Sequence, residues 1–164
     1  MAALAGTALA PGAHCQLRES ILVRPRALLA DDHAALIEAE TALLLRHFDV
    51  VGAVNDGAML VSQALRLDPD VIVADITMPV LDGIRAIRRL RESGCKAKIV
   101  FLTIHSEQEF IQACLAEGAL GYVVKSDMKA HLVPAIRAAL AGQRYIAISA
   151  ARAANPPWSP SGQE

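Results

Sequence analysis

The sequence predicts an open, doubly wound α/β domain built around a five-stranded parallel sheet. Three observations support this fold class: five short runs of consecutive apolar residues, stretches with helical periodicity between them, and connections of only a few residues. Strands that are apolar on both faces belong in a parallel sheet that helices cover on both sides. The predicted strands are residues 27–30, 50–54, 71–74, 99–102 and 121–124.

Each predicted strand is followed by a predicted helix. The first helix places Leu36, Ile37, Leu43, Leu44 and Phe48 on one side, but a carboxylate, Glu40, falls within this apolar stripe and weakens it. The five predicted helices are residues 33–47, 57–67, 83–93, 107–117 and 129–141.

Residues at the helix ends agree with this plan. Asp82 is placed to cap the third helix. Ser106 and Glu109 match the capping-box pattern at the start of the fourth helix, and Gly118 is placed to end it. The basic cluster at the third helix is interpreted as a solvated face, with a patch that faces a kinase or another acidic partner as the alternative; it contains Arg85, Arg88, Arg89, Arg91, Lys96 and Lys98.

Composition restricts the classes of function. A net charge of -1 argues against a broad surface for nucleic acid or anionic membranes, and no apolar run has the length of a bilayer-spanning helix. The cysteines are odd in number and lack metal-ligand spacing, which favours a reducing compartment over a disulfide framework or a zinc site. A cytoplasmic location without membrane contact is therefore expected.

The two ends of the chain differ from the part between them. Residues 1–23 are predicted to be a flexible extension rather than a signal peptide, because no basic residue precedes Arg18. Residues 148–164 are small, polar and proline-rich, and they are predicted to be disordered. The folded domain is expected to span 24–147.

Polar residues follow four of the apolar runs. Asp31 and Asp32 come after the first run, Asp75 after the third, Thr103 after the fourth and Lys125 after the fifth. Taken singly, these are a helix cap, a turn former, a strand residue and a surface lysine. Ligands bind beyond the carboxyl ends of the strands in this fold class, so the five residues are expected to share one site.

The predicted site is acidic. Three clustered carboxylates repel one another unless a cation joins them, and one lysine cannot neutralise all three. Mg²⁺ prefers oxygen ligands and often binds substrate phosphate at the same time. The residue types therefore predict a magnesium site that handles phosphate.

The chain resembles the receiver domains of two-component response regulators. The segments that carry the resemblance are "LLADDH" (28–33), "VIVADITMPVLDG" (71–83), "IVFLTIHSE" (99–107) and "GALGYVVKSD" (118–127). They lie within residues 26–142 and look most like receivers usually joined to a LuxR/NarL-like helix-turn-helix. The resemblance implies a flavodoxin-like (βα)5 fold with strand order 2-1-3-4-5.

The resemblance also implies roles for the acidic residues. Asp75 would be the phosphoacceptor for a sensor histidine kinase. Mg²⁺ would be held by Asp32, Asp75 and the backbone carbonyl of Thr77, with Asp31 acting through water.

Other residues would bind and report the phosphoryl group. Thr103 and Lys125 would bind its oxygens, and movement of Thr103 would leave space that Tyr122 fills. An output protein or domain would respond to the face formed by the fourth helix, fifth strand and fifth helix, and a homodimer is compatible with the resemblance.

Two histidines flank the predicted site. His33 and His105 are most simply explained as helix-start and loop residues. His105 and Thr77 lie two residues after Thr103 and Asp75, respectively, where they are placed to tune hydrolysis of an acyl phosphate.

Several alternatives remain open. No basic recognition helix follows the fifth predicted helix, so the chain is a stand-alone receiver or part of a longer regulator, and direct nucleic-acid binding is not expected. An aspartyl-phosphate phosphohydrolase would need a second acid two residues after the nucleophile, where this chain has Thr77, so an enzyme is not expected. The remaining alternative is an interaction module that is not phosphorylated.

Overall fold

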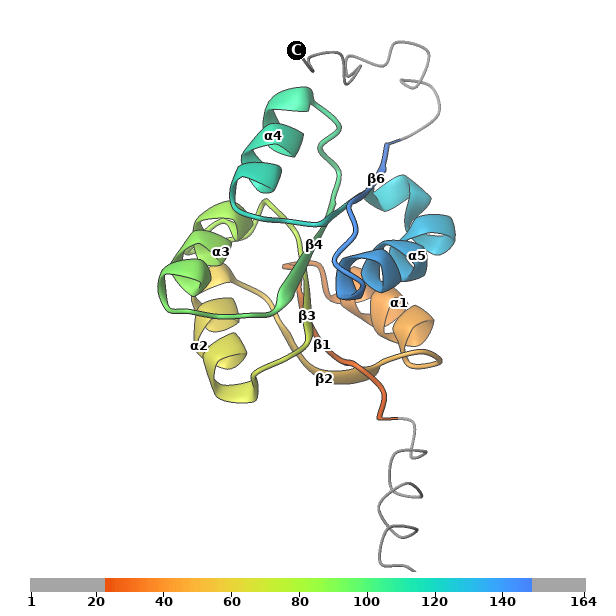
Figure 1. Ribbon diagram of the computed structural model, residues 1–164, viewed down its shortest axis with the longest axis horizontal. Helices are drawn as coiled ribbons and strands as arrows, with labels where there is room; N and C mark the ends of the chain where they lie inside the picture. The colour runs from red at the N-terminus through yellow and green to blue at the C-terminus, as the bar shows by residue number, and fades with distance from the viewer. Residues whose placement is uncertain (1–22, 149–164) are drawn as a thin grey trace, which may run out of the picture.

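Six parallel strands form the central sheet of the computed structural model, which describes residues 23–148 (Figure 1). The strand order is β2-β1-β3-β4-β5-β6, which confirms the doubly wound α/β class and the predicted order of the first five strands. The strands are β1 (Arg26–Ala30), β2 (Asp49–Val54), β3 (Val71–Ala74), β4 (Lys98–Thr103), β5 (Gly121–Val124) and β6 (Tyr145–Ala147).

Helices cover both faces of the sheet. In Figure 1, α2, α3 and α4 lie on one side and α1 and α5 lie on the other. The helices are α1 (Ala34–Leu44), α2 (Gly57–Leu67), α3 (Gly83–Glu92), α4 (Gln108–Ala116) and α5 (Met128–Leu140), with a short 3₁₀ helix, η2 (Lys125–Asp127), before α5.

Each central strand contributes side chains to two hydrophobic cores, one on each face of the sheet. Leu28 and Ala30 of β1 pack in the core with α2, α3 and α4, whereas Ala27 and Leu29 pack in the core with α1 and α5. Successive side chains of a strand point to opposite faces, so a strand covered on both sides must be apolar throughout. This explains the continuous apolar runs in the sequence.

The sixth strand is a correction to the five-stranded sheet that the sequence predicts. After α5, Gly142 adopts a φ of 76° and the chain turns back to place β6 parallel to β5. The backbone N–H of Tyr145 donates to the Leu120 carbonyl (2.8 Å). A strand of three residues has no periodicity of its own, and its pairing with β5 is a tertiary event.

Helix boundaries are partly as predicted. Asp82 caps α3 by accepting a hydrogen bond from the Arg85 N–H (2.8 Å), and Gly118 follows α4 with a φ of 85°. The predicted capping box of α4 is wrong, because the N-cap is Glu107. A Cβ atom added to Gly83 would lie 2.0 Å from the Asp75 carbonyl oxygen, so only glycine lets α3 start this close to β3.

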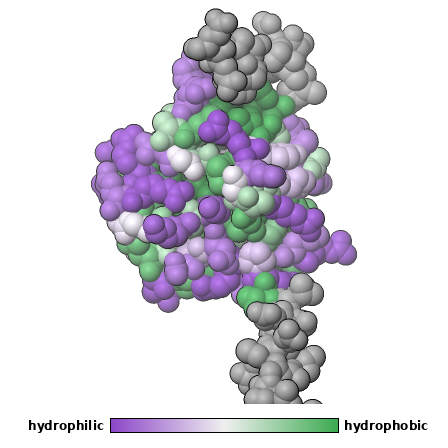
Figure 2. All heavy atoms as spheres, in the orientation of Figure 1, coloured by the Kyte–Doolittle hydropathy of each residue, from purple (hydrophilic) through white to green (hydrophobic). Residues whose placement is uncertain are grey.

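The outer face of α3 is hydrophilic, and so is the surface around it (Figure 2). Arg85, Arg88 and Arg89 are exposed, and Arg88 forms an ion pair with Glu117 (2.6 Å). These contacts support the interpretation of the basic cluster as a solvated face.

The expectations for the two ends of the chain stay predictions. The expected extension and tail lie outside residues 23–148, apart from Val23 and Ile148 at the limits of this range. Within the range, no helix combines the length and apolar character that crossing a membrane would require.

Candidate functional site

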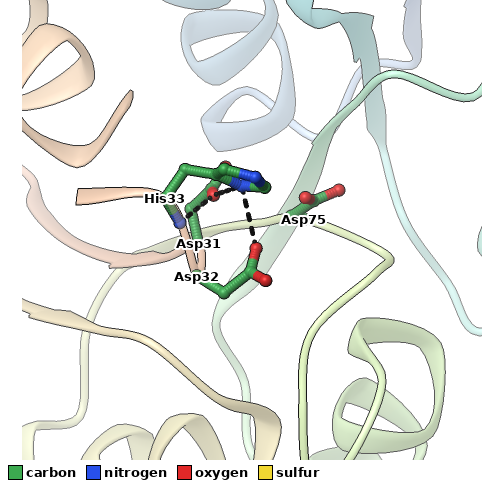
Figure 3. A group of neighbouring side chains, drawn as sticks. All are labelled: Asp31, Asp32, His33 and Asp75. Atoms are coloured by element: carbon green, nitrogen blue, oxygen red, sulfur yellow. Dashed lines mark hydrogen bonds and ion pairs between the residues drawn. The ribbon is translucent and has the colours of Figure 1, made fainter. Parts of the chain in front are cut away.

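The acidic residues meet at the carboxyl edge of the sheet. β1 and β3 are neighbours, with Ala30 opposite Ala74, so the residues that follow them emerge side by side. The Asp75 N–H donates to the Ala30 carbonyl (2.8 Å), which extends this pairing to Asp75 itself. Asp31 and Asp75 therefore come from sequence positions far apart but lie in one cluster (Figure 3).

Lys125 lies between two buried carboxylates. Its Nζ is 2.5 Å from Asp31 Oδ2 and 2.8 Å from Asp75 Oδ2, and the three side chains are at most 8% exposed. Burial alone would lower the pKa of Lys125, but its close contacts with the Asp31 and Asp75 carboxylates outweigh burial, so the pKa is raised. Lys125 is thus held as an ammonium shared by both acids.

The chain holds Asp75 rigidly from both sides. Asp75 Oδ1 accepts a hydrogen bond from the Ile76 N–H (2.7 Å), and Asp75 Oδ2 contacts Lys125. In the following loop, Leu81 N–H donates to the Pro79 carbonyl (2.7 Å) across Val80, which has a φ of 68°. This conformation is strained for a β-branched residue, so packing of the rest of the loop must maintain it.

Asp32 and His33 form the exposed side of the cluster. The Asp32 side chain is 32% exposed, and His33 Nδ1 lies 2.9 Å from Asp32 Oδ1 and 3.1 Å from Asp31 Oδ1. The His33 N–H also donates to Asp31 Oδ1 (2.8 Å). Figure 3 shows the imidazole in contact with the carboxylates of Asp31 and Asp32, with Asp75 on the other side of the cluster.

Glu40 adds a further carboxyl group behind the cluster. It is 1% exposed on α1, and its pKa is raised to about 8 by burial first and then by Asp31 and Asp75, while Lys125 acts in the opposite direction. The residue that weakened the apolar stripe in the sequence is therefore fully buried. Its proximity to the site was not predicted.

His105 connects the remaining predicted residues. Its backbone N–H donates to Thr103 Oγ1 (3.4 Å), and its carbonyl accepts from the hydroxyl of Tyr122 (2.8 Å). Its imidazole Nε2 forms a hydrogen bond with Thr77 Oγ1 (2.8 Å) and its ring stacks on Phe110 with centroids 4.1 Å apart. The sequence placed His105 in a loop but did not predict this linking position.

The predicted residues therefore form two groups, and the members of each group are linked to one another. Asp31, Asp32, Asp75 and Lys125 are in the charged cluster, and Thr77, Thr103 and Tyr122 are joined through His105. Tyr122 is fully buried, and its predicted role as a reporter of the phosphoryl group stays a prediction.

The donor set fits a hard divalent cation. Among residues 23–148, Asp31 Oδ2 is buried without a hydrogen bond, and its neutralisation depends on the charge of Lys125 2.5 Å away. One ligand atom from each of Asp31, Asp32, His33 and Asp75 lies within 4.8 Å of the others. Clustered carboxylates of this kind supply the oxygen ligands that Mg²⁺ requires.

Comparisons with known proteins agree with the geometry. The family model of the response regulator receiver domain matches residues 27–137. The response regulator GacA of Pseudomonas viridiflava is 37% identical over 123 residues, which are 74% of this chain and 58% of that protein. The transcriptional regulatory protein LiaR of Bacillus subtilis is 34% identical over 125 residues, which are 72% of this chain and 57% of LiaR. The chain thus spans less than two thirds of the length of these relatives.

Solved structures show the same fold. A two-component response regulator of the LuxR family from Aurantimonas sp. SI85-9A1 is 34% identical with a TM-score of 0.73, covering 80% of this chain and 94% of that chain. The isolated receiver domain of RcsB from Salmonella enterica serovar Typhimurium, solved with the phosphomimetic BeF3-, is 25% identical with a TM-score of 0.71. That match covers 79% of this chain and 97% of the RcsB chain.

Proposed function

The chain belongs to the family of response regulator receiver domains, and we propose that it accepts a phosphoryl group on Asp75 from a sensor histidine kinase. The observation that carries this proposal is the position of Asp75, buried to 3% exposure on a rigid strand end with the Lys125 ammonium 2.8 Å from its Oδ2. Phosphoryl transfer requires positioning and charge neutralisation more than covalent assistance, and this site offers both.

In the proposed reaction, a carboxylate oxygen of Asp75 attacks the phosphorus of the kinase's phosphohistidine. The new P–O bond gives an acyl phosphate, and the P–N bond breaks as the imidazole leaves. The Lys125 ammonium then also pairs with the phosphoryl oxygens. Because the same ammonium pairs with Asp31, it stays in place when Asp75 loses its negative carboxylate.

A magnesium ion would be held by Asp32, Asp75 and the backbone carbonyl of Thr77, with Asp31 acting through water. When bound, Mg²⁺ supplies positive charge to the phosphoryl oxygens. Asp32 is the most exposed carboxylate of the cluster and remains accessible to the ion, whereas Asp31 is 1% exposed and stays paired with Lys125. This difference supports a direct role for Asp32 and a water-mediated role for Asp31.

The signal would leave the site through His105. A phosphoryl group adds charge of about -1.5 to -2 and new hydrogen-bond acceptors, which attract the Thr103 hydroxyl. Thr103 and Tyr122 both form hydrogen bonds with the backbone of His105. A shift of Thr103 would therefore move His105 and change the contacts that hold Tyr122 and α4. A coupling of about 1–3 kcal/mol would change partner affinity about 5- to 150-fold.

The proposed partners are a sensor histidine kinase in the cytoplasm and an output protein or domain, with a homodimer as one form of the signalling state. The protein would act as a signalling switch rather than as an enzyme. Position 77 is a threonine, so the second acid that an aspartyl-phosphate phosphohydrolase uses does not follow the nucleophile.

Intact-mass measurement after incubation with Mg²⁺ and acetyl phosphate tests the proposal. We expect one phosphoryl adduct on the wild-type chain, and none without metal or in Asp75→Asn. Asp70→Asn is a matched control, because Asp70 is exposed at the opposite end of the sheet. A wild-type protein that stays unmodified would instead support the unphosphorylated interaction module.

A further inference from the structure

The imidazole of His33 lies within the acidic cluster rather than beside it. Its Nδ1 approaches Asp31 Oδ1 and Asp32 Oδ1 at 3.1 and 2.9 Å, and one nitrogen of the ring belongs to the group of ligand atoms from Asp31, Asp32 and Asp75 that lie within 4.8 Å of one another. The nitrogen therefore occupies a position from which it and the carboxylates can reach a common ion (Figure 3).

The role of His33 in α1 does not account for this position. His33 is the N-cap residue of α1, but within residues 23–148 its side chain makes no capping hydrogen bond. The side chain is 64% exposed, so packing does not force the ring against the carboxylates. The contacts of Nδ1 are to acidic oxygens, and these are groups that also ligate metals.

A histidine ligand changes which ions an oxygen site prefers. Carboxylate and water ligands suit Mg²⁺, whereas imidazole nitrogen favours borderline ions such as Co²⁺, Ni²⁺ and Zn²⁺. Because ionised carboxylates only accept hydrogen bonds, Nδ1 donates its proton in these contacts. A divalent ion bound at this point would take the place of that proton.

We propose that His33, through Nδ1, joins the carboxylates as a nitrogen ligand, so that the site also binds borderline divalent transition-metal ions. This inference rests on the proposed metal site and adds a ligand to it. Mg²⁺ binds with oxygen ligands and does not require His33, so the two kinds of ion compete for one site but depend differently on His33.

Parallel calorimetric titrations of the full chain with Co²⁺ and Mg²⁺ test the ligand assignment. His33→Ala is expected to weaken Co²⁺ binding by about tenfold or more and to change Mg²⁺ affinity by less than about twofold. Asp32→Asn should weaken both ions. His47→Ala, which removes an exposed histidine from the loop after α1, should change neither affinity.

Nuclear magnetic resonance provides a second readout that does not depend on folding of the variant. Zn²⁺, which is diamagnetic, should shift the ¹⁵N resonance of His33 Nδ1 in the wild-type chain if it binds there, while the ring ¹⁵N resonances of His47 and His131 keep their positions. An unchanged His33 Nδ1 resonance at saturating Zn²⁺ would overturn the proposal.

The calorimetric outcomes also separate the competing explanations. If His33→Ala strengthens both ions, His33 is a cation that competes with metal; if it weakens both equally or neither, the ring is not a selective ligand. Each of these results overturns the assignment. The proposed phosphoacceptor function fails on a different result, namely the lack of a Mg²⁺-dependent adduct on the wild-type chain.

Discussion

The two ends of the sheet use charge in different ways. At the amino edge, the Arg26 N–H donates to Asp70 Oδ2 (2.7 Å) and the Arg26 guanidinium donates to the carbonyls of Leu67 (2.6 Å) and Asp68 (3.0 Å). Asp70 is exposed there. At the carboxyl edge, Lys125 is shared by two buried carboxylates, with Asp32 and Glu40 nearby.

The comparison distinguishes charges that stabilise the fold from charges that form a site. The amino-edge groups form hydrogen bonds with backbone atoms and stay close to solvent. The free-energy cost of desolvating them is therefore low, and their effect is to fix the strand ends. The carboxyl-edge acids are buried in excess over their cation, which is unfavourable for stability. Buried charge in excess of its counter-ion is typical of sites that bind cations or phosphate, and this supports the proposed function.

Replacing the shared ammonium should give the largest contrast between the two edges. Lys125→Met leaves Asp31 and Asp75 buried without their cation, and it should lower the free energy of unfolding by roughly 3–5 kcal/mol. Arg26→Met removes bonds to two carbonyls and should cost about 1 kcal/mol. Urea denaturation at pH 7 without divalent ions measures both.

Excess Mg²⁺ is a further control on this contrast. It should restore part of the stability of Lys125→Met by supplying positive charge to the carboxylates, and it should leave Arg26→Met unchanged relative to wild type. Equal losses in the two variants would show that the edges do not differ in the way described.

The buried Glu40 should make stability depend on pH. Its pKa is about 8 in the folded chain and about 4.5 when exposed, so between these values the folded state holds a proton that the unfolded state has lost. The free energy of unfolding therefore falls as pH rises from 4.5 to 8, by at most about 1.4 kcal/mol per pH unit. Glu40→Gln should flatten this slope in a series of denaturation curves.

Glu38→Gln is the matched control, because Glu38 is an exposed carboxylate on the same helix. It should keep the wild-type slope, since water solvates its charge in both states. A wild-type slope that survives in Glu40→Gln would assign the pH dependence to another group.

The bond between Thr77 and His105 should affect how long the phosphoryl group stays on Asp75. It joins the loops that follow β3 and β4, and its loss should admit water to the acyl phosphate. His105→Ala is expected to shorten the lifetime of the adduct about three- to tenfold, or about 0.7–1.4 kcal/mol of the barrier. Mass spectra taken after removal of the phosphodonor follow the decay.

Thr77→Val breaks the same bond from the other loop and should shorten the lifetime in the same direction. His47→Ala should leave it unchanged, because His47 is exposed in the loop after α1. If Thr77→Val lengthens the lifetime while His105→Ala shortens it, the two residues act separately and the bond is not the barrier to water.

The smallest effect is expected at β6. The hydroxyl of Tyr145 shares a hydrogen bond with His131 Nδ1 (2.8 Å), which fastens the start of β6 to α5. Tyr145→Phe should cost about 0.5–1.5 kcal/mol locally and increase amide exchange in residues 145–147. Exchange in β1 and β3 should stay as in wild type, and a rise there as well would indicate global rather than local loosening.

The sequence predicted the strands that form the site with good accuracy. All five predicted strands begin and end within one residue of the observed ones, and the third and fifth coincide with β3 and β5. Their position was predictable because burial on both faces leaves an uninterrupted apolar run. The residues after these runs were predicted to meet because parallel strands end at one edge.

What the sequence alone determined is the list of groups at the carboxyl edge: Asp31, Asp32, Asp75, Thr103 and Lys125. Tertiary packing decided the rest, including the burial of Glu40, the imidazole of His33 against two acids, the backbone link at His105 and the pairing of β6 with β5. The physical reason is that apolar periodicity is a local property of the chain. The direction of a polar side chain and the partner of a three-residue strand are set by neighbours that are distant in sequence.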